Sequence, residues 1–410
     1  MTTPAERYAA AKLRGQHPIT TDFLLTFEFE FDPFQVAACH AVEEGKGVLV
    51  AAPTGAGKTV VGEFAAYFAL QAGKKCFYTT PIKALSNQKY SEFVAKFGED
   101  RVGLLTGDTS INGDADILVM TTEVLRNMLY AGSNTLTNLG CVVMDEVHYL
   151  ADKFRGAVWE EVLIHLMESV QVISLSATVS NAEEFGEWLG EVRGQTEVIV
   201  SELRPIPLFQ HVLIGNRLLD LFDAPGRINP EVLNREREMT RRASLGRNRR
   251  GRFAEPSDRL SRADIIEKLQ GESLLPAITF IFSRIGCDAA VKQCLHAGLR
   301  LTSPEEREEI KRTALKYTQN IAEEDLEVLN FKEWLTALER GIAAHHAGLL
   351  PSFKGAVEDL FQRGLVKAVF ATETLALGIN MPARTVVLEK LIKFNGEAHV
   401  PITPGEYTQL

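Results

Sequence analysis

The sequence of 410 residues has little cysteine and no long apolar run, and each absence excludes a class of protein. Its five cysteines are scattered and show neither zinc-site spacing nor the density of a secreted disulfide scaffold. No apolar segment is long enough to cross a bilayer, and the first residues, Met1–Arg7, form no signal core. We therefore expect a cytoplasmic protein without a membrane partner, whose cysteines are buried thiols.

Positive charge is also scarce. Lys and Arg number 44 against 54 Asp and Glu, which leaves a net charge of −10, so any surface that binds nucleic acid must be local. The remaining composition, 45% hydrophobic and 24% charged, is ordinary for a globular protein. The length suits two domains of about 200 residues each.

A glycine-rich loop follows the apolar strand Gly47–Ala51 and precedes an amphipathic stretch that begins at Val60. Strand, loop and helix occur in the order of a phosphate-binding loop, whose backbone N–H groups close around phosphate oxygens at a helix N-terminus. We expect Lys58 to reach the β- and γ-phosphates of ATP and the Thr59 hydroxyl to bind Mg²⁺. The loop residues expected to bind ATP are Thr54, Gly55, Ala56, Gly57, Lys58 and Thr59.

Two adjacent carboxylates, Asp145 and Glu146, end a second apolar run, Cys141–Met144. A buried strand that ends in two carboxylates delivers one to a magnesium ion and the other to a water molecule, as hydrolysis of a nucleoside triphosphate requires. We therefore expect Asp145 and Glu146 to act with Lys58 in catalysis and to hold Mg²⁺ together with Thr59.

Short β-rich runs alternate with helical patterns through most of the chain, which indicates an α/β fold with parallel sheets covered by helices. In the first half the expected strands are Val48–Ala51, Lys75–Thr79, Val102–Leu105, Asp116–Met120, Cys141–Met144, Gln171–Leu175 and Glu197–Val200. A second series comprises Pro276–Phe282, Gly341–Ala344, Val366–Ala371 and Thr385–Leu388. We expect two similar α/β domains in tandem, with phosphate chemistry at the carboxyl ends of the first sheet.

The expected organisation has four segments: an N-terminal extension (1–28), a first domain (29–203), a linker (204–272) and a second domain (273–410) that is incomplete at its C-terminus. The linker contains an arginine-dense stretch, residues 235–252, for which two interpretations stay open. It follows a phosphate backbone, or it is a disordered charged linker, which is slightly favoured. The later segment Ser303–Arg340 is helical in pattern and begins with a capping sequence.

Small polar residues follow three further strands of the first domain. At the carboxyl end of a strand they can hold successive phosphates of an extended nucleic-acid strand. The residues expected to do so are Pro81, Lys83, Gln88, Thr106, Gly107, Thr121 and Thr122. Ser176 and Thr178 end the strand after the acidic pair, where they can hydrogen-bond that pair and report on its state.

The ordered set of motifs resembles superfamily 2 helicases of the DExH-box class and, within it, the superkiller-type RNA helicases. The resemblance covers nearly the whole chain from about Phe29 onward. The motifs that carry it are Asp145–Gly156, Trp159–Glu161, His345–Pro351 and Ala371–Ala383. It implies two RecA-like domains, ATP and Mg²⁺ as cofactors, and 3′→5′ movement along single-stranded RNA.

The resemblance also implies roles for individual residues. Gln35 would pair with the adenine edge while Phe29 stacks on the ring, and His148 would link the catalytic acids to Ser176 and Thr178. In the second domain, Ser283, Thr372 and Thr374 would contact the nucleic acid. Gly378 and Asn380 would lie near the nucleotide. For His345 and His346 we prefer packing and hydrogen bonding over metal binding.

The chain stops at Leu410, where the family continues into an arginine motif that reaches the γ-phosphate. We expect a fragment of a longer helicase, in which catalysis falls by about 10³ without those arginines. Two alternatives stay open: a DNA helicase of a related repair type, and an ATP-gated nucleic-acid clamp that does not unwind. The expected partners are single-stranded RNA, or DNA, and an RNA-processing nuclease, and the oligomeric state stays unknown.

Overall fold

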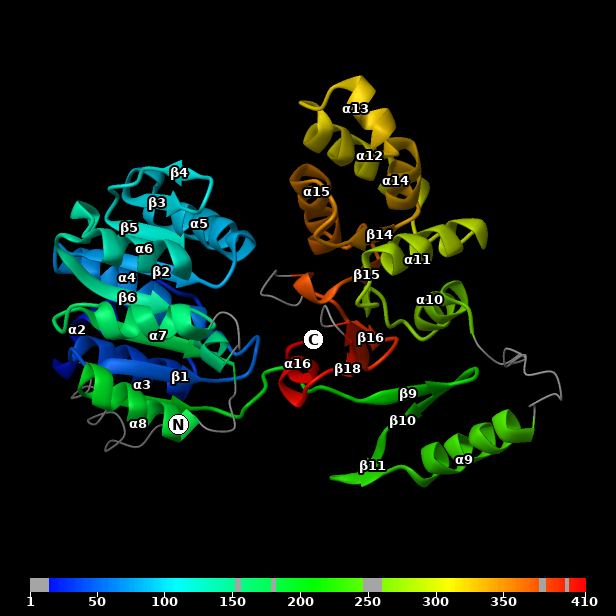
Figure 1. Cartoon of the computed structure of the whole chain (residues 1–410), viewed down its shortest axis with the longest axis horizontal. Coiled ribbons are helices and arrows are strands. Elements are labelled where there is room, and N and C mark those ends of the chain that lie inside the picture. Colours follow the sequence, from blue (N-terminus) through cyan, green and yellow to red (C-terminus); the bar gives the residue numbers. More distant parts are fainter. Residues whose placement is uncertain (1–14, 152–155, 178–181, 246–259, 376–380, 395–397) are drawn as a thin grey trace. The chain divides into compact units, whose positions relative to one another are not determined.

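The computed structural model describes residues 15–151, 156–177, 182–245, 260–375, 381–394 and 398–410. The chain divides into two compact units, Met1–Ile206 and Pro207–Leu410 (Figure 1). Three of the expected site residues, Thr178, Gly378 and Asn380, lie outside the described residues. The four expected segment boundaries stay predictions.

The first unit is built on an eight-stranded sheet in the order β4-β3-β5-β2-β6-β7-β1-β8. Neighbouring strands are parallel except for the β3–β4 pair. The strands are β1 (Gly47–Ala51), β2 (Lys75–Thr80), β3 (Val102–Leu105), β4 (Ser110–Ile111), β5 (Ile117–Thr121), β6 (Leu139–Met144), β7 (Gln171–Ser176) and β8 (Thr196–Val200). The seven strands expected here are confirmed, and the short edge strand β4 is an addition.

Successive side chains of a strand point to opposite faces, and this alternation produces two cores. Val48 and Val50 of β1 pack with one group of helices, whereas Leu49 packs with the other. The first group is α3 (Pro33–Glu43), α4 (Thr59–Gln71) and α5 (Lys83–Phe97). The second is α6 (Thr122–Ala131), α7 (Gly156–His165) and α8 (Ala182–Arg193). Helices on both faces of a mostly parallel sheet confirm the expected fold class.

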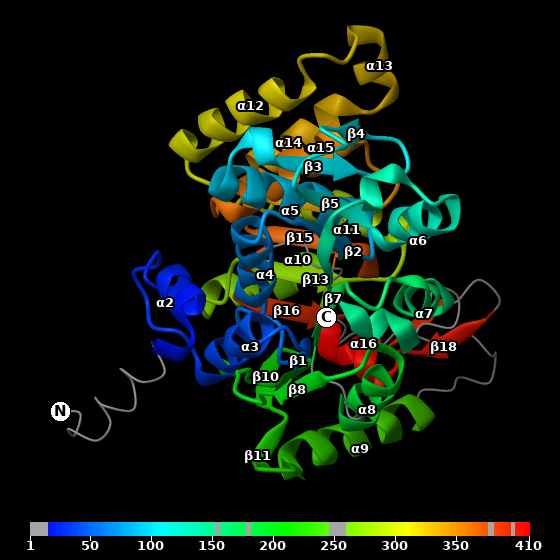
Figure 2. The same cartoon turned by 90° about the vertical axis from the view of Figure 1, so that its left-hand side faces the viewer.

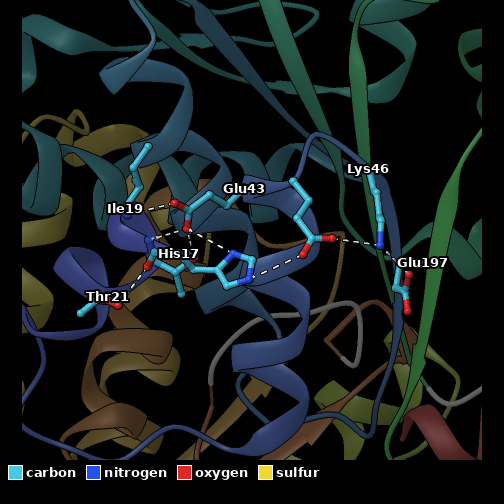
Figure 3. A network of polar contacts seen from close by, with 8 residues as sticks. His17, Ile19, Thr21, Glu43, Lys46 and Glu197 are labelled. Atoms are coloured by element: carbon cyan, nitrogen blue, oxygen red, sulfur yellow. Dashed lines mark hydrogen bonds and ion pairs between the residues drawn. The ribbon is translucent and has the colours of Figure 1, made fainter. Parts of the chain in front are cut away.

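A short helix, α2 (Pro18–Leu24), lies beside α3 and α4 (Figure 2) and buries Phe23 in the first core. Its first turn is capped from a distance, because Glu43 accepts hydrogen bonds from the backbone N–H groups of Ile19 (3.0 Å) and Thr20 (2.8 Å), as Figure 3 shows for Ile19. Residues expected to form an extension are thus packed and hydrogen-bonded to the first unit.

The same network continues across the end of α3 (Figure 3). The ring of His17 stacks on His40, with 3.9 Å between the ring centroids. Lys46 Nζ lies 2.9 Å from a carboxylate oxygen of Glu44 and 3.4 Å from one of Glu197 in β8. Polar contacts therefore connect the start of the described chain to the last strand of the sheet.

The second unit begins with two antiparallel hairpins and a helix. They are β9 (His211–Ile214) with β10 (Arg217–Asp220), β11 (Phe222–Ala224) with β12 (Arg227–Ile228), and α9 (Pro230–Leu245). The first part of the arginine-dense stretch lies in α9, so its interpretation as a disordered linker is wrong up to Leu245. The rest of that stretch, residues 246–252, lies outside the described residues.

The second sheet has four parallel strands in the order β14-β15-β13-β16. They are β13 (Ala277–Phe280), β14 (Ile342–His345), β15 (Ala368–Ala371) and β16 (Thr385–Leu388), which confirms the four strands expected here. One face packs on α10 (Arg262–Gly271) and α11 (Arg284–His296), the other on α12 (Pro304–Thr318) and α15 (Pro351–Gln362). The remaining elements are α13 (Glu323–Val328), α14 (Phe331–Glu339), the hairpin β17 (Ile392–Phe394) and β18 (His399–Pro401), and α16 (Pro404–Gln409).

Two smaller expectations are also confirmed. Ser303 caps α12 in a reciprocal capping box with Glu306, and all five cysteines are buried as free thiols. Within the described part of the chain, every helix is too short or too polar to span a lipid bilayer.

Candidate active site

The glycine-rich loop lies between the carboxyl end of β1 and the start of α4. Gly55 and Gly57 have φ values of +82° and +80°, a conformation that other residues rarely adopt. Space is limiting as well, because a Cβ atom on Gly57 would lie 2.5 Å from Nε2 of Gln35. Both glycines are therefore required by the backbone conformation of this loop.

Lys58 is folded back on this loop. Its Nζ donates hydrogen bonds to the carbonyl oxygens of Ala52 (2.8 Å) and Pro53 (3.1 Å). Burial lowers the pKa of the Lys58 ammonium group, while the nearby carboxylates of Glu146 and Asp145 oppose that shift. The structure thus brings the three expected catalytic charges within electrostatic reach of one another.

Gln35 is buried against the loop instead of being open to a ligand. Its Nε2 donates to the carbonyl oxygens of Ala56 (3.3 Å) and Gly57 (3.1 Å), and its Oε1 accepts from the backbone N–H of Asp32 (2.9 Å). Phe29 is 56% exposed and packs on the rings of Phe27 and Phe31. Recognition of adenine by Gln35 and Phe29 stays a prediction.

The acidic pair follows β6, which lies next to β2 in the sheet. The hydroxyl of Tyr78 in β2 donates to Asp145 Oδ2 at 2.7 Å, and the backbone N–H of Glu146 donates to Asp145 Oδ1 at 3.0 Å. Both carboxylate oxygens of Asp145 are therefore held in place. Tyr78 was not predicted as a site residue, because in sequence a tyrosine in an apolar strand is indistinguishable from an ordinary core residue.

Glu146 has an unusual backbone and an unusual acidity. Its φ is +53°, in the left-handed region that non-glycine residues seldom occupy. Burial, with the charge of Asp145, raises its pKa to about 7, although Lys58 and Lys89 act in the opposite direction. His148 Nδ1 lies 3.3 Å from Glu146 Oε2, and burial lowers the pKa of that histidine to about 4. At neutral pH a neutral imidazole therefore faces a carboxyl group that readily exchanges its proton.

The residues expected to hold Mg²⁺ are a hydroxyl and two carboxylates, the hard oxygen donors that this ion prefers. The surroundings of Thr59 are consistent with that role, since the ammonium group of Lys89 stands 3.3 Å from Thr59 Oγ1. This hydroxyl oxygen already faces one cation, so the donor set fits the metal. Lys89 was not predicted as a site residue, although its position was a signal: Leu85, Lys89 and Phe93 follow one another at four-residue spacing along α5, and all three are buried.

Ser176 ends β7, where its carbonyl oxygen accepts a hydrogen bond from the N–H of Ala52 at the start of the loop (3.2 Å). Its own hydroxyl is buried and has no hydrogen-bond partner among the residues that the structure describes. The structure thus places Ser176 against the loop, and its expected link to His148 stays a prediction.

Most of the residues expected to bind nucleic acid in the first unit lie at the carboxyl ends of three adjacent strands, β3, β5 and β2, whereas Lys83 and Gln88 belong to α5. Thr106 and Gly107 follow β3, Thr121 ends β5, and Pro81 follows β2. Because carboxyl ends of parallel strands share one edge of a sheet, these residues lie at the same edge as the phosphate loop.

Individual contacts separate these residues into accessible and structural ones. Lys83 is exposed and its Nζ lies 2.6 Å and 2.7 Å from the two carboxylate oxygens of Asp108. Gln88 donates from Nε2 to Glu92 (2.7 Å). Thr122 is fully buried and its hydroxyl donates to the carbonyl oxygen of Thr80 (3.3 Å), so its direct contact in this structure is with the backbone.

In the second unit the corresponding residues also lie at strand ends. The hydroxyl of Ser283 caps α11 by accepting from the N–H of Gly286 (3.1 Å), and the hydroxyls of Thr372 and Thr374 are 3.0 Å apart after β15. The hydrogen-bonding role of the two buried histidines is confirmed. His345 Nε2 lies 2.8 Å from Glu358 Oε1, and His346 Nε2 lies 3.0 Å from Asp288 Oδ1.

Known helicases are similar to this chain in sequence. Residues 32–185 match the family model described as DEAD/DEAH box helicase. The chain is 60% identical over 405 residues to "Probable helicase HelY" of Mycobacterium leprae, which covers 95% of this chain and 44% of that protein. It is 43% identical to "DExH-box ATP-dependent RNA helicase DExH15 chloroplastic" of Arabidopsis thaliana, over 97% of this chain and 37% of that protein. It is 41% identical to "Superkiller complex protein 2" of Homo sapiens, over 93% of this chain and 32% of that protein.

The chain thus spans less than half the length of these relatives. The resemblance to superkiller-type helicases, including the actinobacterial HelY proteins, is confirmed along almost its whole length, and the family implies the use of ATP. This chain carries a DEAD/DEAH box helicase domain and is a homologue of the DExH-box RNA helicases.

Proposed function

We propose that this chain is the core of an ATP-dependent RNA helicase, which couples ATP hydrolysis to 3′→5′ movement along single-stranded RNA. The observation that carries the proposal is the meeting of Lys58, Asp145 and Glu146 at one edge of the first sheet, where the two carboxylates act on the pKa of the lysine. A phosphate loop beside two adjacent acids is suited to cleavage of a nucleoside triphosphate by water.

Each group of the site has a role in that reaction. The loop N–H groups and Lys58 bind the phosphates of the substrate ATP, for which Lys58 exchanges the carbonyl oxygens of Ala52 and Pro53 for phosphate oxygens. Thr59, Asp145 and Glu146 would hold Mg²⁺, which would supply positive charge to neutralise the phosphates. Glu146 orients the attacking water and accepts its proton, and a pKa of about 7 suits a general base at neutral pH.

The neighbouring strand ends supply the RNA-binding surface. The ends of β3, β5 and β2 present polar side chains and backbone N–H groups side by side, as binding of successive phosphates requires. Lys83 exchanges its Asp108 partner for a phosphate. RNA is favoured over DNA because the relative from Arabidopsis is named as an RNA helicase.

The proposal extends to the setting of the protein. The human relative is named as a protein of a superkiller complex, which supports a role within an assembly. We infer that this protein acts in the cytoplasm beside an RNA-processing nuclease. Copurification of a tagged chain from its native cell, followed by an RNA degradation assay, would show a nuclease that is lost when the tag is omitted.

The decisive test compares ATP hydrolysis with matched RNA and DNA oligonucleotides, beside a strand-displacement assay. RNA should stimulate hydrolysis and support displacement, Lys58→Ala should abolish both, and Glu146→Gln should keep ATP binding while hydrolysis falls by about 10² or more. Stimulation by DNA alone would favour the DNA helicase, and hydrolysis without displacement would favour the clamp. Turnover that persists in Lys58→Ala would overturn the assignment.

A further inference from the structure

Lys89 is a buried lysine beside the catalytic groups. It belongs to α5 and is 7% exposed, on the stripe of that helix that faces the first core. Lysine is among the residues least often buried, because an ammonium group loses its hydration there unless partners replace the water. Its partners therefore indicate what the position is for.

Two groups accept hydrogen bonds from the Lys89 ammonium group. Its Nζ lies 2.8 Å from Glu92 Oε2 and 3.3 Å from the Thr59 hydroxyl oxygen. Glu92 is itself held, since its other carboxylate oxygen accepts a hydrogen bond from Gln88 (2.7 Å). Lys89 also acts on Glu146, whose acidity it strengthens against the effect of burial. One cation thus bridges a carboxylate on α5 and the hydroxyl expected to bind Mg²⁺.

We propose that Lys89 is a positioning residue of the metal site, which holds the Thr59 hydroxyl and balances the acidic pair until a divalent cation takes that place. The proposal rests on the proposed function. An ammonium group and a divalent cation repel each other and compete for the same hydroxyl oxygen. Glu92 already contacts Lys89, and Lys89 keeps this partner when it leaves the Thr59 hydroxyl. Lys89 thereby weakens metal binding at the loop.

The competition is measurable without turnover. The dissociation constant of a fluorescent ADP analogue is determined by titration in EDTA and again in saturating Mg²⁺. The constant in EDTA divided by the constant in Mg²⁺ reports how strongly metal and nucleotide assist each other's binding. In Lys89→Met the ratio should rise about fivefold, because one screened charge has been removed from the metal's surroundings. Binding in EDTA should weaken, since the nucleotide loses a nearby cation.

A second variant changes the same balance in the other direction. Glu92→Gln removes the charge that draws Lys89 away from Thr59, so the ratio should fall. Lys96→Met is the matched control, because Lys96 lies on the same helix but pairs with Glu63 and packs over the rings of Phe23 and Phe27. Its ratio should equal that of the wild type.

The outcomes are separable. A ratio unchanged within twofold in both Lys89→Met and Glu92→Gln, with native circular dichroism, would overturn the inference and leave the helicase proposal intact. Should Lys89→Met fail to fold, Glu92→Gln alone decides. If the wild type binds no nucleotide, or Lys58→Ala binds it equally well, it is instead the proposed function that fails.

Discussion

The two units differ in what lies beside selected carboxylates. In the second unit, Glu358 and Asp288 each have a histidine partner, His345 and His346. In the first, Glu146 also has a histidine nearby, His148, but it directly follows the buried Asp145, whose charge joins burial in raising the pKa of Glu146. A hydrogen-bonded carboxylate stabilises a fold, whereas like charges held together are unfavourable and are typical of a functional site. The two parallel sheets thus belong to one fold class, but only the first has two adjacent acids at its expected catalytic site.

The largest effect that would test this contrast is expected when one lysine in each unit is replaced by alanine. Lys58→Ala should weaken ATP binding about 100-fold, because a charged contact to phosphate is lost. The matched Lys367 donates to the carbonyl oxygen of Leu301 and the carboxylate of Glu306, each at 2.9 Å. Lys367→Ala should destabilise the second unit and leave the dissociation constant of ATP unchanged. Comparable losses of binding in both variants, measured by calorimetric titration, would remove the distinction between the units.

A smaller effect concerns the pH dependence of stability. The pKa of Glu146 is about 7 in the folded protein and about 4.3 in an unfolded chain, so its contribution is complete below about pH 4 and is lost as pH rises through 7. Glu146→Gln cannot ionise. Relative to wild type, it should gain about 2.5 kcal/mol of unfolding free energy between pH 5 and pH 8.

The control for that experiment lies in the second unit, where Glu358→Ala leaves His345 without its partner. This variant should lose stability at both pH values. Urea denaturation at pH 5 and pH 8 measures all three proteins. An identical difference between Glu146→Gln and wild type at the two pH values would show that the pKa of Glu146 is not raised in the folded protein.

The smallest effect distinguishes a long-range helix cap from a local one. Glu43→Ala removes the acceptor for the N–H groups of Ile19 and Thr20, and should lower the unfolding free energy by about 2 kcal/mol. Ser303→Ala removes the cap of α12, which is worth about 1 kcal/mol. Urea denaturation of both variants tests the order. A smaller loss for Glu43→Ala than for Ser303→Ala would mean that α2 contributes little to the first unit.

The sequence predicted those parts of the molecule that depend on local pattern. Buried parallel strands are continuous apolar runs, so β1, β6 and β13 were evident from the sequence. The phosphate loop was also predictable, because its backbone conformation requires glycines at fixed spacing. The hairpins β9–β10 and β11–β12 were missed, because their strands are at most four residues long and are half exposed or exposed.

Contacts between distant residues were not predictable. The bond from Tyr78 to Asp145 depends on β2 and β6 being neighbours in the sheet, although 67 residues separate the two side chains along the chain. Likewise Gln35 reaches the loop carbonyls only because α3 packs against the loop. Lys89 could have been noticed as a charge on an apolar stripe, but its target, Thr59, is set by the packing of α5 on α4.

The burial of all five thiols has a practical consequence for the experiments above. Burial raises the pKa of Cys294 to about 11 and that of Cys287 to about 12, so these sulfurs stay protonated and unreactive toward maleimides near neutral pH. A cysteine introduced in place of the exposed Ala72, in the turn between α4 and β2, would be the preferred site for a fluorophore. The natural sequence can therefore serve as its own background for site-directed labelling.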